Sequence, residues 1–368
     1  MRSGTSLLYN PAVRQFVYQA LTVVFVIGLF WYAGTNAAAN LARANMTAGF
    51  DFLGSRAGFD IAQTPIEYSS DSTYMRALML GLVNTLIVAS TGIVTATIIG
   101  LLVGIGRLSN NWLIARLSTV YVEVFRNIPP LLVIFFWYKG VLSVLPQPRE
   151  SIKLPFSIFL NNRGLAFPKP MWAESAWLIP VALLVGIIAT ILVSRWASAR
   201  QARTGQQFPT GWTGLGLIIG LPVLMFLALG MPVAFEYPVA GKFNLTGGSV
   251  VGPEFVSLYL ALSFYTAAFI AEIVRSGIKA VAKGQTEAAF ALGLQPGVTT
   301  RKVVVPQALR IIIPPLTSQY LNLTKNSSLA IAIGFSDLVS VGGTILNQTG
   351  HAVEIVAIWM VVYLAISL

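Results

Sequence analysis

The sequence predicts an all-α polytopic membrane protein with about eight transmembrane helices. Of its 368 residues, 55% are hydrophobic and only 10% are charged, whereas soluble domains carry about 25% charged residues. A spanning helix needs about 20 mostly apolar residues, and eight segments meet or approach this requirement. They are residues 15–34, 77–105, 127–145, 176–194, 212–234, 255–274, 309–333 and 352–368.

The first and last of these segments raise questions about the ends of the chain. Residues 33–40 read AGTNAAAN, a small-residue stretch that would suit signal-peptide cleavage. The apolar core before it is longer than the usual signal-peptide core of about 7–15 residues, so we expect a retained helix, with cleavage as the alternative. The eighth segment reaches Leu368 without a charged residue to stop it, so we expect the natural span to continue further.

The positions of lysine and arginine predict the orientation. If the N-terminus is cytoplasmic, the inner segments hold 14 basic and three acidic residues, and the outer segments hold nine basic and ten acidic residues. An excess of basic residues in cytoplasmic loops is the positive-inside pattern. The net charge of +11 is therefore explained by the basic residues of the predicted cytoplasmic segments, and no nucleic-acid partner is expected. The segments 35–75 and 146–175 become periplasmic loops, for which we expect short interfacial helices.

Several kinds of chemistry lack the residues they would need. The chain has no cysteine and a single histidine, His351, so neither a disulfide nor a Cys- or His-rich metal site is expected. It also lacks the G-x-x-x-x-G-K-[ST] loop that cradles nucleotide phosphates. We therefore expect no catalytic residues, metal or cofactor, and an enzyme is the least favoured class.

Residues 287–306 read EAAFALGLQPGVTTRKVVVP, which is too polar and too broken to span a membrane. We expect a short helix from Glu287 to Leu292, with Glu287 in its first turn and Gly293 ending it in a left-handed conformation. A turn at Pro296-Gly297 should follow, after which Thr299 or Thr300 caps the next helix. From these residues alone, an ordinary amphipathic connection lying on the lipid headgroups is the favoured alternative.

Two Glu-x-x-Arg pairs lie near cytoplasmic ends of predicted spans, namely Glu123 with Arg126 and Glu272 with Arg275. Residues three apart share a helix face. The pairs are therefore predicted to be helix-end ion pairs, with a direct role in substrate handling as the alternative.

The predicted span 309–333 is interrupted by polar residues. A lysine near the bilayer centre costs about 2.5–3.5 kcal/mol on insertion scales, so it should face a cavity, a bundle interior or a partner. Hydrogen bonding between helices and snorkelling are the alternatives. The candidate pathway residues are Lys325, Asn326, Ser327 and Ser328. Pro129-Pro130 and Pro314-Pro315 are expected to kink their helices.

The stretch 287–306 resembles the EAA loop of bacterial ABC-importer permeases, whose pattern is EAA-x3-G-x9-I-x-L-P. The chain departs from it only in having Val303 and Val305 at the Ile and Leu positions. Residues 81–109, 121–138, 262–294 and 306–338 are similar to the polar amino-acid uptake subfamily. The extra N-terminal span and an insertion at about 146–240 look like the longer permeases of general L-amino-acid transport systems.

This resemblance implies a type I ABC-importer permease core in a bacterial inner membrane. Residues 1–76 would form an N-terminal helix and periplasmic loop, and residues 77–368 the permease domain, with a cytoplasmic coupling loop at about 276–308. The resemblance implies that Glu287, Ala288, Ala289, Gly293 and Pro306 couple the permease to a separate ATP-binding subunit. It further implies a second permease subunit, here expected to be a paralogue, and a periplasmic amino-acid-binding protein. The particular amino acid is not implied.

An ion-coupled secondary transporter working without an ATPase is the alternative function. It would need ion-coupling acids within the spans, and the candidates there are Glu123 and Glu272, both near helix ends. A membrane scaffold without transport activity would not require the interrupted, charged span at 309–333.

Overall fold

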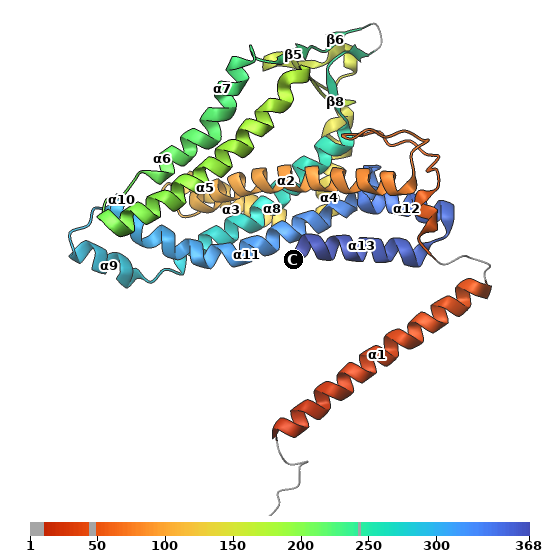
Figure 1. Ribbon diagram of the computed structural model, residues 1–368, viewed down its shortest axis with the longest axis horizontal. Helices are drawn as coiled ribbons and strands as arrows, with labels where there is room; N and C mark the ends of the chain where they lie inside the picture. The colour runs from red at the N-terminus through yellow and green to blue at the C-terminus, as the bar shows by residue number, and fades with distance from the viewer. Residues whose placement is uncertain (1–10, 44–48, 242–243) are drawn as a thin grey trace, which may run out of the picture. The chain divides into compact units, whose positions relative to one another are not determined.

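The computed structural model describes residues 11–43, 49–241 and 244–368. The chain forms two compact units, one made of the residues up to Trp137 together with Ser257–Leu368, and the other of Tyr138–Val256. Both are mainly helical, as predicted (Figure 1). Arg2, which contributes to the predicted orientation, lies outside the described residues, as does part of the loop 35–75.

The first unit contains most of the long helices. They are α1 (Pro11–Arg43), α2 (Tyr74–Gly106), α3 (Trp112–Asn127), α4 (Pro130–Phe135), α8 (Pro253–Lys279, which begins in the second unit), α9 (Lys283–Ala291), α10 (Pro296–Thr299), α11 (Val305–Asn326), α12 (Leu338–Thr349) and α13 (Ala352–Ser367). Short 3-10 or π turns in this unit lie at Asp51–Gly54, Thr300–Val304 and Ser327–Ile333. Those at Phe136–Val141 and Leu142–Val144 follow α4 into the second unit.

The second unit joins a helical hairpin to small antiparallel sheets. Its helices are α5 (Leu178–Thr204), α6 (Thr210–Leu215) and α7 (Leu221–Ala228), and a π turn at Gly216–Gly220 connects α6 to α7. The largest sheet has the order β1-β2-β3-β8 (Ile152–Leu154, Ile158–Asn161, Gly164–Phe167 and Ser249–Val251). The other pairs are β4 with β5 (Lys169–Trp172 and Val233–Glu236) and β6 with β7 (Val239–Ala240 and Leu245–Thr246).

These strands correct one expectation and support another. Between residues 146 and 175 the structure has strands and 3-10 turns instead of helices lying on the interface, because β-branched and aromatic residues there pair across short turns. The pairing of β3 with β8 and of β4 with β5 brings the two loops that flank the hairpin together. Loops paired in one sheet lie on one side of a membrane, in agreement with the predicted topology.

The predicted count of eight separate spans is not reproduced in the described residues. Five helices are long and apolar enough to cross a membrane, or up to seven when each of two sharply bent helix pairs is counted as one span. The predicted third span is the second arm of one pair, since α3 and the helix from Pro130 to Val144 meet at 109°. The predicted seventh span is the first arm of the other pair, which bends by 52° before α12. The eighth, α13, is a shorter apolar helix.

Proline explains the first bend and glycine the second. Pro129 is the N-cap of α4 and Pro130 its first residue, so α3 ends before them because the residue preceding a proline avoids the helical region. Pro314 and Pro315, in contrast, lie inside the continuous helix α11. The chain turns only at Gly334, which has a φ of +80°. Sequence analysis did not predict α12, the helix after this turn.

A row of small residues lets α2 approach α8 closely. Gly92, Ala96, Gly100 and Gly104 recur at every fourth position and are all buried. A Cβ atom added at Gly100 would lie 2.6 Å from Cβ of Ile270, and one at Gly104 would lie 2.8 Å from the carbonyl oxygen of Ala271. Close approach of this kind, through small residues four apart, is a main way in which membrane helices associate.

The other sides of α2 pack on α11 and α12. A Cβ at Gly81 would lie 3.0 Å from the carbonyl oxygen of Asp337, and Gly92 faces the side chain of Leu323. Thr85 Oγ1 accepts a hydrogen bond from the N–H of Leu338 at 3.1 Å. Because α2 contacts both arms of the second bent pair, it holds the corner of that pair in place.

Next to Gly104, where the row of small residues ends, an ionic cluster joins α2 to α8. Arg107, the C-cap residue of α2, and Arg275 both donate to the carboxylate of Glu272. The three side chains are only 14%, 26% and 24% exposed, respectively. The cluster therefore fastens the two helices where the row of small residues stops.

Replacing Gly100 tests the close packing of α2 on α8. We expect Gly100→Leu to destabilise the protein by about 1–3 kcal/mol, the usual cost of overpacking, because even its Cβ would clash with Ile270. Gly28→Leu is the matched control, since Gly28 lies in α1 with no atom within 4 Å of its added Cβ. Thermal unfolding of the purified chain in detergent measures both. An equal shift in Tm for the two variants would contradict close packing at Gly100.

Candidate functional site

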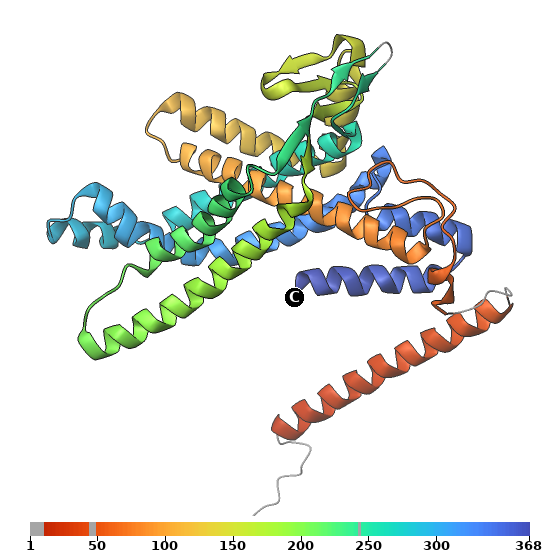
Figure 2. The same ribbon diagram turned by 45° about the horizontal axis from the view of Figure 1, so that its top comes forward.

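The predicted coupling loop forms a helix-turn-helix at one end of the first unit. Figures 1 and 2 show α9 and α10 where α8 leads into α11, at the opposite end of this unit from α12. Helix α9 begins at Lys283 and has no acidic residue in its first turn. The prediction that Glu287 opens the helix was therefore wrong, because the helix starts four residues earlier and Glu287 lies in its second turn.

The end of α9 was predicted correctly. Gly293 has a φ of +73°, the left-handed conformation that glycine adopts without steric cost. Its N–H donates to the carbonyl of Phe290 at 2.9 Å, and the N–H of Leu294 donates to that of Ala289 at 3.1 Å. These bonds pair the last carbonyls of the helix and fix the direction in which the chain leaves it.

The threonines after the turn do not have the predicted role. Helix α10 begins at Pro296 with Gln295 as its N-cap residue, so Thr299 and Thr300 come too late to cap it. Thr299 is only 1% exposed, and its hydroxyl has no hydrogen-bond partner among the described residues. A π turn at Thr300–Val304 leads into α11, with Pro306 at the start of that helix, where a missing N–H is tolerated.

The predicted coupling residues differ in exposure. Glu287 and Ala288 are exposed, whereas Ala289 is buried. Sequence analysis missed two large apolar residues beside them, Phe290 and Leu292, which are 49% and 81% exposed. The alternation of Phe and Leu with Ala in residues 288–292 is the signal that could have identified them. Large apolar side chains exposed next to a turn are features of a docking surface.

The candidate pathway residues lie at the end of α11 and in the 3-10 turn after it. Ser327 is fully buried and its Oγ donates to the carbonyl of Thr324, while Ser328 Oγ donates to that of Lys325, both at 2.8 Å. Asn326 is partly buried. Lys325 is exposed and forms no ion pair within the part of the chain that the structure describes. The two serine hydroxyls are thus engaged by their own helix, whereas the Lys325 amine is not.

Two hydrogen bonds between helices were not predicted. Thr95 and Tyr259 join α2 to α8 through their hydroxyls at 2.7 Å, and Thr97 joins α2 to Tyr320 of α11 at 2.8 Å. Threonines two apart on a helix point in different directions, so α2 lies between its two partners. A Thr-x-Thr pair within an apolar span was the available signal.

The two predicted ion pairs have different outcomes in the structure. Glu272 binds Arg275, and Arg107 joins them from α2. Glu123 and Arg126 are both exposed and do not pair. The Arg126 guanidinium lies instead 5.6 Å from the ring centroid of Phe269 on α8, because α3 turns that face toward the aromatic side chain. Within the described ranges no group of three or more His, Cys, Asp or Glu residues could hold a metal ion.

Several named proteins are similar to this chain over nearly its whole length. General L-amino acid transport system permease protein AapQ of Rhizobium johnstonii is 68% identical over 366 residues, covering 100% of this chain and 92% of that protein. The putative amino-acid ABC transporter permease protein YhdX of Escherichia coli is 48% identical over 99% of this chain and 93% of its own length. A glutamate/glutamine/aspartate/asparagine transport system permease protein of Rhodobacter capsulatus, BztB, is 44% identical over 98% of this chain and 92% of its own length.

The chain is also similar to a solved structure and to a described protein family. A crystal structure of an amino acid ABC transporter with histidines matches 80% of this chain and 91% of its own with a TM-score of 0.46 and 20% identity. Residues 96–368 match the family described as binding-protein-dependent transport system inner membrane component. This match spans more than half of the chain and includes α9, the ionic cluster and the bent helix pairs. The chain therefore belongs to the binding-protein-dependent transport system inner membrane component family.

Proposed function

We propose that this chain is the permease subunit of an ATP-driven amino-acid importer and forms one half of its translocation pathway. The relatives that cover nearly the whole chain are amino-acid permeases by name. Hydrolysis of ATP belongs to a separate subunit, because the chain lacks a phosphate-binding loop. The other expected partners are a periplasmic amino-acid-binding protein and a second permease, which is a paralogue in this proposal.

The observation that carries this proposal is the hydrogen-bonded end of α9 and the side chains exposed beside it. Gly293 ends the helix in a left-handed turn, and Glu287, Ala288, Phe290 and Leu292 are exposed beside it. In the proposed mechanism an ATPase subunit binds this surface and moves α9 when the ATPase binds nucleotide. Because α9 lies between α8 and α11, its movement reaches the helices that pack on α2.

The proposed orientation places the N-terminus and α9 in the cytoplasm. The concentration of basic residues in the segments on that side supports it. The arrangement of the first unit also supports this orientation. Residues 53–61 belong to the loop predicted to be periplasmic, and they pack with α12 and α13 at the end of the unit away from α9 (Figure 1). The pathway roles of Lys325, Asn326, Ser327 and Ser328 remain part of the proposal, with Lys325 the most available for a ligand.

Replacing Gly293 with a β-branched residue tests the coupling. In Gly293→Val the side chain must adopt a left-handed conformation that costs about 1–2 kcal/mol for an L-residue, so α9 should end differently. We expect amino-acid uptake to be lost while the membrane abundance stays normal and ATP hydrolysis by the assembled transporter continues. Uptake assays, immunoblots and ATPase assays measure these quantities.

Gly284→Val is the matched control for this variant. Gly284 lies in the same helix, has no atom within 4 Å of an added Cβ and has no positive φ. It introduces the same side chain without the same strain, so uptake should be retained. Normal uptake by Gly293→Val would remove the coupling assignment.

The orientation can be tested by labelling single cysteines, because the natural chain contains none. Thr64 and Ala282 are exposed and lie in loops predicted to be on opposite sides. We expect Thr64→Cys to react with a membrane-impermeant maleimide in spheroplasts, and Ala282→Cys to react only after permeabilisation. Reaction of both residues from outside would contradict the proposed topology.

Gentle purification from the native membrane tests the proposed assembly. We expect mass spectrometry to identify an ATP-binding subunit and a second, related permease together with this chain, because a family member alone has no energy source. If the chain purified alone and supported ion-driven uptake in vesicles without ATP, the proposal would fail. The secondary-transporter alternative would then replace it.

A further inference from the structure

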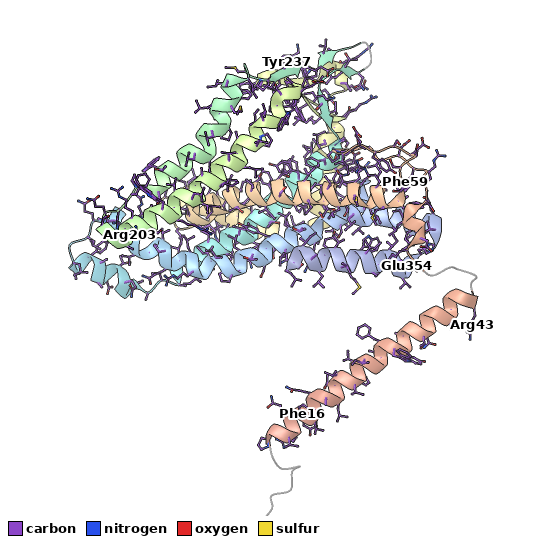
Figure 3. All side chains as sticks on the ribbon, in the orientation of Figure 1. Phe16, Arg43, Phe59, Arg203, Tyr237 and Glu354 are labelled. Carbon is purple, nitrogen blue, oxygen red and sulfur yellow. The ribbon has the colours of Figure 1, made fainter. Side chains whose placement is uncertain are left out.

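The C-terminal end of α5 carries a cluster of arginines that the transport function does not use. From Ser175 to Phe235 the chain contains no acidic residue, and its only charged residues are Arg195, Arg200 and Arg203. All three lie in the last ten residues of α5, and none of them forms an ion pair within the described residues of either unit. Figure 3 labels Arg203 at the end of the helix away from the strands of this unit. We call these residues the α5 arginine cluster.

An aromatic platform orients the middle arginine. The guanidinium carbon of Arg200 lies 5.5 Å from the ring centroid of Trp196, within the range of a cation–π interaction. The ring of Phe208 meets that of Trp196 edge-on, with centroids 5.4 Å apart at 83°. Arg200 also donates to the side-chain carbonyl of Gln206 at 3.0 Å. These contacts hold the guanidinium in position and leave its charge uncompensated.

The length of α5 puts this cluster at the depth of the lipid headgroups. Trp177 and Trp196 are 19 residues apart, which corresponds to about 29 Å at the helical rise of 1.5 Å per residue. The hydrocarbon core of a bilayer is about 30 Å thick, and tryptophan prefers its two boundaries. Arg200 and Arg203 then lie about 6 and 10 Å beyond the boundary, among the headgroup phosphates.

The same face of the helix continues into the membrane as an apolar stripe. Leu192, Ile188 and Val185 precede Trp196 by four, eight and eleven residues and are 60%, 57% and 51% exposed. Arg200 and Arg203 follow Trp196 by four and seven residues, so all lie on one side of α5. From Trp196 to Val185 the stripe spans about 17 Å, close to the depth of one leaflet.

We propose that this face of α5 binds an anionic phospholipid. Arg200 and Arg203 bind the phosphate, since guanidinium groups bind phosphate oxygens in a bidentate manner. Trp196 lies at the level of the glycerol, and an acyl chain follows Leu192, Ile188 and Val185. A zwitterionic lipid is disfavoured, because no carboxylate in residues 175–235 could pair with its ammonium group. In the proposed topology the site lies in the cytoplasmic leaflet.

Native mass spectrometry of the purified full-length chain tests this proposal. The probes are phosphatidylglycerol and phosphatidylcholine with identical acyl chains, titrated separately. Each basic residue near an anionic surface strengthens binding about fivefold, so Arg200→Gln/Arg203→Gln should weaken the binding of phosphatidylglycerol about 30-fold. The binding of phosphatidylcholine should weaken much less, because its ammonium group already offsets the charge of its phosphate. The control Lys153→Gln/Lys169→Gln removes two exposed charges from the strands of the same unit and should change neither affinity.

A charge-retaining variant separates headgroup binding from folding. Arg200→Lys/Arg203→Lys should keep most of the preference for phosphatidylglycerol, because an ammonium group also pairs with phosphate. Equal phosphatidylglycerol affinities for the wild type and the glutamine variant would overturn the proposal, as would an equal loss for both lipids or the same loss in the lysine control. It would also be overturned if the glutamine variant kept its lipid but lost a co-purifying soluble subunit.

Discussion

The close approach of α2 to α8 through small residues is the contact on which the rest of the first unit depends. In a membrane the hydrophobic effect does not drive helices together, so association rests on packing and polar contacts. Gly92, Ala96, Gly100 and Gly104 supply the packing. The ionic cluster around Glu272 and the bond between Thr95 and Tyr259 add polar contacts along the same interface. A larger side chain at these positions would separate the helices and remove Arg107 from Glu272 and Thr95 from Tyr259.

The same helix also organises the second bent pair. Gly81 and Thr85 contact the backbone where α12 begins, and Asn84 donates to the carbonyl of Ser336 at 3.0 Å. Asp337, which is fully buried, caps α12 through the N–H of Ser340 at 2.9 Å. Irregular backbone within a membrane is tolerated only where its polar groups have partners. The break before α12 is therefore an ordered corner, held by side chains from α2.

The end of α9 and the α5 arginine cluster are different surfaces with different chemistry. The end of α9 exposes an acid, small residues and two apolar side chains around one glycine turn, a shape suited to a protein partner. The α5 arginine cluster combines net positive charge, an oriented tryptophan and an apolar stripe, which suits a molecule with an anionic head and an acyl tail. The two surfaces belong to separate units of the chain, and variants at one leave the residues of the other unchanged.

The sequence by itself determined the class of the protein, most of its helices and the turn at Gly293. These depend on local properties, namely the length of apolar runs, the position of basic residues and the left-handed preference of glycine. Tertiary structure decided the rest. Two contacts depend on which helices become neighbours. Glu272 pairs with Arg107 of α2, and Arg126 lies against Phe269 of α8 and does not pair with Glu123. The strands of the second unit and the corner before α12 likewise need partners distant in the sequence, and no local pattern specifies those partners.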